Sequence, residues 1–431
     1  MTMRERIASH DAIWLQDSET NLMVINAVIV TDRLDLQTLR TTFQQRVFEG
    51  PDPGRFERLR CRITGSGLVR YWERDRDFHI DRHIFAARGE NLHSLAAVQA
   101  YVGEQASHKL DRDRPRWEIQ VIEGFEDGGT ALLVRIHHSI GDGMALVSLM
   151  FALMDEPWNR EDGMAQGSVH PSPGARLLGK TLRAVMIPLS APGILIRRLT
   201  WIPDRSHLHG PHLSGRKRVA WTEPLDLEVL KKAKNRLGAT VNDVLMTSVS
   251  GAFSMYLERH GDVSPKRFRI SMPVNVRHPG KALRCENHFA AVPLELPAGS
   301  GPLQPRIEAV KAHMDGLKRS VAPLVVYGIQ RLLLSLLPKA VSRGLIDFLA
   351  NKCTAVVTNV PGPPTEIAIE GRKVRSILFW VPQRARIGIG ISILSFAGKV
   401  QVGVMADEAL MPDPATLVRA FEDEFDALRA L

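Results

Sequence analysis

The sequence predicts an α/β protein with mixed sheets, arranged as two domains. Apolar runs of strand length alternate with segments whose apolar residues recur at helical spacing. The 431 residues are enough for two substantial cores. A polar stretch with glycine and proline follows Met154 and separates two such regions. We therefore expect an N-terminal domain over residues 1–155, a basic and apolar crossover over 156–215, and a C-terminal domain over 216–431.

Helices and strands alternate in the first half of the sequence. Alternating or continuous apolar runs predict strands, and apolar residues at helical spacing predict helices. The predicted elements are a helix over 8–15, a strand over 23–31, a helix over 36–46, a strand over 78–84 and a helix over 95–110.

A hairpin is expected next. Residues 117–122 and 132–136 have strand character, and the EDGGT sequence at 126–130 supplies a turn between them. Trp117 begins the first of these strands, and we interpret it as a core aromatic residue. The hairpin should hold the loop that follows it in a fixed position.

Two adjacent histidines, His137 and His138, stand where this hairpin ends and shortly before a predicted helix. Asp142 occupies the N-cap position of that helix. Its apolar residues at helical spacing are Leu146, Leu149, Met150 and Leu153. Consecutive side chains of an extended chain point to opposite sides, so only one of the two histidines should face a given cavity.

The residue types in this loop allow three interpretations. Histidine is the side chain best suited to accept and return a proton near neutral pH, which favours a general base. Gly141 and Gly143 permit a tight bend and the close approach of a substrate. Alternatively, the histidines are only hydrogen-bonded parts of the loop, with Asp142 capping the helix. A metal shared by His138 and Asp142 lacks a third ligand at suitable spacing, so we expect no metal site.

The second half begins after a basic, apolar block at 176–198, which either lies on a membrane or packs as a crossover between domains. Asn242 and Asp243 stand at the start of one predicted helix, where such residues are favoured as caps. The predicted elements are a strand over 219–221, helices over 225–237 and 238–261, a strand over 268–276, a helix over 305–318, an apolar helical segment over 321–349 broken at Pro338, strands over 355–360, 375–378, 387–394 and 399–406, and a helix over 414–431.

The composition narrows the choice of partners. A formal net charge of +9 suits anionic partners such as nucleic acid, a membrane surface or CoA phosphates, or is simply a basic solvated surface. No zinc-finger or RNP-type motif occurs, so we expect no nucleic-acid partner. Cys61, Cys285 and Cys353 are odd in number and far apart, which fits a reducing cytoplasm. Without a signal sequence or a long apolar stretch, we expect a cytoplasmic protein that can lie on the inner face of the cell membrane.

The motif HHxxxDG at residues 137–143 resembles the active-site motif of CoA-dependent acyltransferases. Other blocks resemble, in the same order along the chain, the wax ester synthase/diacylglycerol acyltransferase family of that superfamily. These blocks contain Asp11, Trp14, Asp17 and Met23 near the start, Trp117, then Asn242 and Asp243, then Ser271, Pro273, Val274, Asn275 and Arg277, then Asn287, and finally Thr358, Asn359, Pro361, Gly362 and Pro363. We assign no catalytic role to Asp17.

The resemblance implies two chloramphenicol acetyltransferase-like domains with a tunnel between them. Residues 137–143, which we call the histidine loop, would lie in the middle of this tunnel. It implies an O-acyltransferase that moves a fatty acyl group from acyl-CoA to diacylglycerol or a long-chain fatty alcohol, at a membrane or lipid-droplet surface. No cofactor is expected, because acyl-CoA is a substrate. The implied site residues are His138 as general base, His137 and Asp142 as loop support, Gly143, Asn275 and Arg277 as loop or oxyanion support, and Asn359 and Gly362 as tunnel lining.

Asn275 could donate a hydrogen bond to a developing oxyanion, and Arg277 could pair with Asp142. Two alternatives keep the same fold. One is a free-standing condensation-type acyltransferase with another acyl donor or acceptor, and the other is a lipid-binding relative without turnover. The sequence leaves open the acceptor alcohol, the acyl chain length and the oligomeric state.

Overall fold

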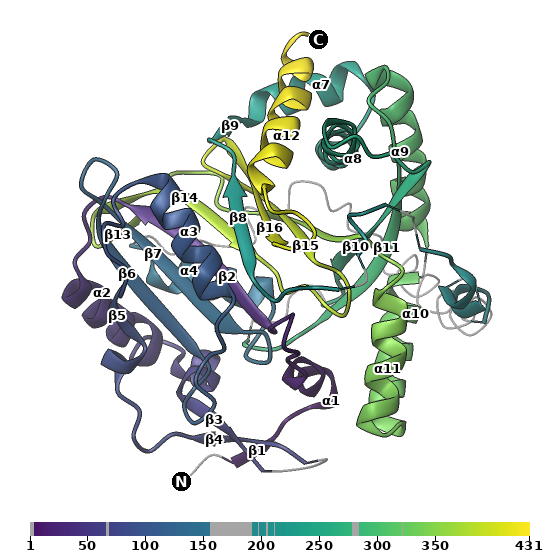
Figure 1. The fold of residues 1–431 in the computed structure, drawn as a ribbon. Helices are drawn as coiled ribbons and strands as arrows, with labels where there is room; N and C mark the ends of the chain where they lie inside the picture. Colours follow the sequence, from purple (N-terminus) through teal and green to yellow (C-terminus); the bar gives the residue numbers. More distant parts are fainter. Residues whose placement is uncertain are drawn as a thin grey trace, which may run out of the picture.

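A computed structural model describes residues 4–65, 69–155, 192–196, 198–203, 206–210, 212–277, 284–320 and 322–431. Most of the predicted crossover therefore lies outside the described residues. The described part forms two mixed sheets with helices packed against them (Figure 1).

The first sheet carries the predicted hairpin at its centre. Strands β6 and β7 pair in antiparallel fashion, with Trp117 opposite Ile136, and β2 pairs on the other side of β7. The strands in spatial order are β13 (Ala368–Ile369), β14 (Arg372–Trp380), β2 (Val24–Thr31), β7 (Gly129–His137), β6 (Trp117–Phe125) and β5 (Ile84–Ala86). Trp117 is buried and stacks on Phe43, as expected of a core aromatic residue.

The second sheet combines parallel and antiparallel neighbours. Its strand β12 lies parallel to both β10 and β15, and the outer pairs are antiparallel. The strands in spatial order are β11 (Phe289–Pro297), β10 (Arg267–Asn275), β12 (Ala355–Pro361), β15 (Ile389–Phe396), β16 (Lys399–Asp407) and β8 (Lys217–Trp221), with β9 (Leu225–Asp226) beside β16. A small third sheet contains β1 (Arg4–Arg6), β4 (Tyr71–Arg74) and β3 (Cys61–Thr64).

The helices form where the apolar spacing predicts them. Thr240 and Asp243 form a capping box at the start of α8, and Pro338 separates α10 from α11. The longer helices and the short α1 are α1 (Ser9–Ala12), α2 (Leu36–Phe43), α3 (Leu95–Ala106), α4 (Gly143–Leu153), α7 (Leu227–Arg236), α8 (Val241–Arg259), α9 (Leu303–Arg319), α10 (Ala322–Leu336), α11 (Lys339–Ala350) and α12 (Pro414–Arg429). Residues 192–196 and 198–200 are also helical. Within the described ranges, no helix has both the length and the apolar character needed to cross a membrane.

The strand predicted over residues 78–84 is wrong in this structure. A 3₁₀ turn at Ile80–Arg82 replaces it, and only Ile84–Ala86 is a strand. The N–H groups of Arg82 and His83 donate to the carbonyls of His79 and Ile80. This turn allows Phe78 to stack on His83, which an extended chain would place on the opposite face.

The two sheets do not divide along the sequence, although the domain boundaries predicted at 155 and 216 remain predictions. Strand β14 belongs to the later half of the chain but pairs with β2 in the first sheet. Its last residue, Trp380, is fully buried and lies against Gly403 of β16 in the second sheet. A Cβ atom at Gly403 would lie 2.8 Å from Nε1 of this indole, so the sheets meet where a side chain is absent.

We predict that Gly403→Val destabilises the protein by about 1–3 kcal/mol, because the added side chain overpacks the contact with Trp380. Thermal unfolding followed by circular dichroism would measure the change. Gly301→Val is the matched control, because no atom lies within 4 Å of the Cβ it would add. Equal midpoints for the two variants would contradict close packing at this contact.

Candidate active site

The histidine loop joins strand β7 to helix α4 at the boundary between the two sheets. The alternation of the strand separates its two histidines, so that His138 lines a cavity of about 620 Å³ while His137 points away from it. Both rings are buried. The expectation that only one histidine faces the cavity is therefore confirmed.

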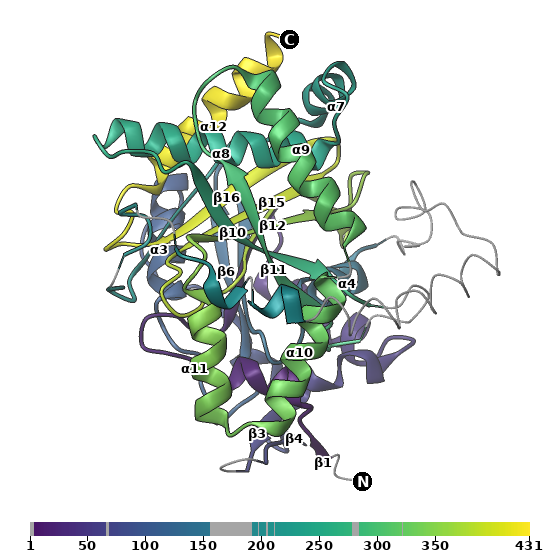
Figure 2. The same ribbon diagram turned by 90° about the vertical axis from the view of Figure 1, so that its right-hand side faces the viewer.

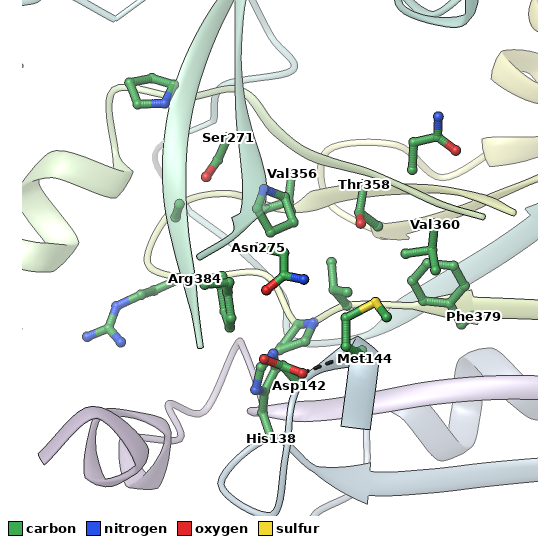
Figure 3. Close-up of a pocket in the computed structure, with 18 of the residues that line it drawn as sticks. His138, Asp142, Met144, Ser271, Asn275, Val356, Thr358, Val360, Phe379 and Arg384 are labelled. Atoms are coloured by element: carbon green, nitrogen blue, oxygen red, sulfur yellow. Dashed lines mark hydrogen bonds between the residues drawn. The ribbon is translucent and has the colours of Figure 1, made fainter. Parts of the chain in front are cut away.

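Walls from both sheets enclose the cavity. Figure 3 shows His138 and Asp142 below Asn275, with Ser271, Val356 and Thr358 farther along the second sheet. The predicted site residues that line this cavity are His138, Asp142, Gly143, Asn275, Arg277, Asn359 and Gly362. The structure thus brings together residues that the sequence separates by more than 200 positions.

The side chain of Asn287 fixes the orientation and the tautomer of His138. Its amide Nδ2 donates to Oδ1 of Asp11 at 2.8 Å and to the carbonyl of His138 at 2.9 Å. Because both partners are acceptors, the amide must turn its own Oδ1 toward the ring, where it lies 2.9 Å from Nδ1 of His138. The Nδ1 atom therefore carries the proton, and Nε2 keeps a free lone pair.

An ion pair anchors the series of hydrogen bonds that ends at His138. Arg58 Nη1 lies 3.0 Å from Oδ2 of Asp11, which is fully buried. Asp11 also accepts from the backbone N–H of Asn287 at 3.2 Å. These contacts therefore connect four segments of the protein. They run from Arg58 in a turn to Asp11 in the N-terminal helix, then to Asn287 before β11, and finally to His138 in the loop after β7.

Aromatic rings complete the environment of His138. Trp14 stacks on it with ring centroids 3.9 Å apart and planes inclined by 15°, and Phe289 lies 5.5 Å away. Burial lowers the pKa of His138 to about 4, and the neighbouring Asp142 carboxylate and the Asn287 hydrogen bond offset this only in part. His138 is therefore a neutral imidazole at pH 7.

His137 is held in the opposite tautomer. Its Nδ1 accepts from the backbone N–H of Ser139 at 3.2 Å, so its Nε2 donates to Oδ2 of Asp17 at 3.3 Å. Burial raises the pKa of Asp17, but the hydrogen bond from His137, a hydrogen bond from the Met23 N–H and the nearby charge of Arg116 outweigh it and lower the pKa to about 2. Asp17 thus contacts the histidine that does not face the cavity.

Asp142 uses both oxygens within the protein. Oδ1 accepts from the N–H groups of Met144 and Ala145 and caps α4, as predicted. Oδ2 accepts from Nη1 of Arg277 at 2.6 Å and from the N–H of His288 at 2.9 Å. The predicted contact of Arg277 with Asp142 is therefore confirmed. These bonds leave Asp142 no oxygen for a metal, and the described residues contain no cluster able to hold one.

The remaining predicted residues have different surroundings. Asn275 accepts from the N–H of Arg277 at 3.0 Å through Oδ1, which leaves its amide Nδ2 as a donor at the cavity wall. Asn359 donates to Asn242 at the start of α8. Gly362 packs so tightly that a Cβ atom would lie 2.6 Å from the carbonyl of Ser395. No atom lies within 4 Å of a Cβ added at Gly143, which leaves open space at the N-terminus of α4.

Sequence reasoning did not assign site roles to Asp11, Trp14, Arg58 and Asn287. Three of them stand in segments that carried the family resemblance, and this was the available signal. Arg58 had none, because its contact with Asp11 depends on how a 3₁₀ turn at Pro53–Arg60 packs.

The sequence matches two domain models of one protein family. Residues 10–245 match the wax ester synthase/diacylglycerol acyltransferase catalytic domain, and residues 285–429 match the WS/DGAT C-terminal domain. A probable diacyglycerol O-acyltransferase, tgs1, of Mycobacterium tuberculosis is 26% identical, over 87% of this chain and 84% of that protein. The O-acyltransferase WSD of Acinetobacter baylyi is 24% identical, over 82% of each chain.

Solved structures show the same architecture. A wax ester synthase/diacylglycerol acyltransferase from Marinobacter aquaeolei superimposes with a TM-score of 0.71 at 17% identity, covering 99% of both chains. The first condensation domain of the CDA synthetase gives a TM-score of 0.60 at 15% identity, covering 99% of this chain and 95% of that one. The predicted chloramphenicol acetyltransferase-like fold is confirmed by these likenesses.

We predict that ¹⁵N NMR at pH 7 detects His138 as a single neutral tautomer with its proton on Nδ1. In Asn287→Ala the ring loses the acceptor that fixes this proton, and both tautomers should appear. His137 is the internal control, because its contacts do not include Asn287, and it should keep its proton on Nε2 in both proteins. A His138 proton on Nε2 in the unaltered protein would contradict the assignment.

Proposed function

The chain belongs to the wax ester synthase/diacylglycerol acyltransferase family, and from this premise we propose that it transfers a fatty acyl group from acyl-CoA to diacylglycerol or a long-chain fatty alcohol. The single observation that supports the chemistry best is His138, which is neutral and has its Nδ1 proton fixed. Its Nε2 lone pair is thereby kept for a hydroxyl group in the cavity. The names of the relatives support both acceptor classes.

The reaction needs one base and no covalent enzyme intermediate. Nε2 of His138 accepts the hydroxyl proton while the alcohol oxygen forms a bond to the thioester carbonyl carbon. The tetrahedral intermediate then collapses, the carbon–sulfur bond breaks, and His138 returns the proton to the CoA thiolate. The products are an ester and CoA, and histidine ends as it began. A cavity that holds both substrates makes the transfer effectively intramolecular. We propose that no cofactor takes part.

The negative charge that develops on the carbonyl oxygen needs a donor. Asn275 lies on the wall beside His138, and its Oδ1 is held by Arg277, so we assign its Nδ2 to this oxyanion. Asp142 serves a different purpose in this scheme, because it is bound to Arg277, His288 and the first turn of α4. It holds the loop in shape and relays no proton, and His137 supports the same loop from behind.

The first prediction from this mechanism concerns the base itself. His138→Ala should reduce acyl transfer roughly 10²–10⁴-fold while the fold is kept, because a general base is lost. The assay follows ester formation from labelled palmitoyl-CoA with dioleoylglycerol or hexadecanol, and the thermal midpoint reports folding. His313→Ala, at an exposed histidine of α9, is the control and should retain full activity. Turnover near the unaltered rate in His138→Ala would refute the assignment, and bound substrate without product in the unaltered protein would indicate a lipid-binding relative.

The second prediction concerns pH. Burial lowers the pKa of His138 from the ordinary 6.5 to about 4, so the base stays neutral as the pH falls through 6.5. Acyl transfer should therefore persist below pH 6 and decline only as the pH approaches about 4. The measurement is kcat/KM against pH.

Folding must be monitored in the same experiment. The unfolded chain takes up the His138 proton near pH 6.5, and the folded chain only near pH 4, so this histidine reduces stability as the pH falls across that window. Circular dichroism at each pH identifies the range in which the protein remains folded. An acid limb centred near 6.5 in folded protein would contradict the mechanism.

A further inference from the structure

Exposed apolar side chains gather in one region of the surface. Nine large apolar residues of the described chain are exposed, and seven of them belong to residues 192–202, α10 and α11. We call these seven the apolar patch: Ile196, Leu199, Ile202, Leu332, Leu336, Val341 and Phe348. Such concentration on a few neighbouring segments marks an interaction site more often than scattered exposure does.

The same three segments form one wall of the cavity. Their other faces contribute apolar lining, including Leu195 from residues 192–202, Ile329 from α10 and Leu349 from α11. The wall is therefore one layer of secondary structure thick, with cavity on one side and the apolar patch on the other. Figure 2 shows α10 and α11 at the near surface, with residues 192–202 in teal between their upper ends.

Contacts join these segments to one another. Lys352, just after α11, donates through Nζ to the carbonyl of Trp201 at 2.5 Å and lies 4.3 Å from the centre of the Phe348 ring. Arg269 lies over the Trp201 indole at 4.6 Å. Residues 192–202 and α11 thus form a continuous surface.

The exposed charged side chains described in these segments are positive. Arg331 of α10 and Arg343 of α11 are exposed, Arg198 is half-buried, and Lys352 beside them is buried. The sequences of residues 192–202, α10 and α11 contain a single acid, Asp347, and it accepts from Nε of Arg384 at 2.7 Å. An apolar surface bordered by cations complements a membrane whose headgroups are anionic.

We infer that the apolar patch docks on an anionic phospholipid bilayer, so that the acceptor lipid passes from the bilayer into the cavity between α10, α11 and residues 192–202. This inference rests on the proposed function for its substrate, but the docking itself does not require turnover. A route through a wall one layer thick spares a diacylglycerol or a long-chain alcohol from crossing water.

Vesicle flotation without acyl-CoA tests the docking. The unaltered protein should float with phosphatidylcholine vesicles that contain phosphatidylglycerol, and less with phosphatidylcholine alone. The triple variant Leu332→Ser/Leu336→Ser/Val341→Ser should bind at least roughly tenfold more weakly, because it removes apolar surface from the patch. Val263→Ser is the matched control, because Val263 is 81% exposed and lies outside the three segments. If the triple variant does not fold, Leu336→Ser alone, at a side chain 72% exposed, serves instead.

A second measurement connects docking with lipid entry. With dioleoylglycerol presented in the same vesicles, the triple variant should lose activity in proportion to its binding. With hexanoyl-CoA and hexanol in solution, it should keep activity within about twofold of the unaltered protein, because its three residues do not line the cavity. An equal loss on both substrates would overturn the entry route.

Three further outcomes would distinguish membrane docking from dimer formation and from a failure of the proposed function. Equal flotation of the triple variant and the unaltered protein would overturn docking through the apolar patch. A dimer in size-exclusion chromatography that the triple variant abolishes, without vesicle binding, would assign the surface to a second copy of the chain and overturn the inference. Vesicle binding by a protein that makes no ester would contradict the proposed function and leave docking standing.

Discussion

The hydrogen bond between Asn287 and Nδ1 of His138 is the interaction on which the site depends. The Asn287 amide can take only one orientation, because its Nδ2 donates to Asp11 and to the carbonyl of His138. Arg58 in turn holds Asp11 in place. A buried network of this kind is effective when every member is satisfied, since a single unpaired group would cost more than its bond contributes. The position of the base is therefore set jointly by the N-terminal helix, the first sheet and the segment that enters the second sheet.

The two adjacent histidines illustrate how one strand end supports two functions. Pleating sends their rings to opposite sides, and each side provides a different partner. His137 meets a carboxylate and becomes an Nε2 donor, whereas His138 meets an amide oxygen and becomes an Nδ1 donor. Asp142 and Arg277 then close the loop against the second sheet, so the geometry around the reacting atoms comes from both sheets.

The lipid character of the proposed substrates gives the two faces of α10 and α11 a common explanation. Their inner face lines an apolar cavity, and their outer face exposes part of the apolar patch. Ordinary amphipathic helices bury one face and show water a polar one. These helices depart from that pattern, which is physically reasonable if a bilayer rather than water covers them.

The sequence by itself determined the local structure: the hairpin, the helix capped by Asp142, the break at Pro338 and the rule that only one histidine faces the cavity. Each depends on periodicity or capping within a few residues. Through family resemblance it also indicated the chemistry. Only the tertiary structure decided that Asn287 and Asp11 orient His138, that β14 joins the first sheet, and that residues 78–84 turn instead of extending. Those features depend on contacts between residues distant in the chain, and on aromatic packing that outweighs a local alternating pattern.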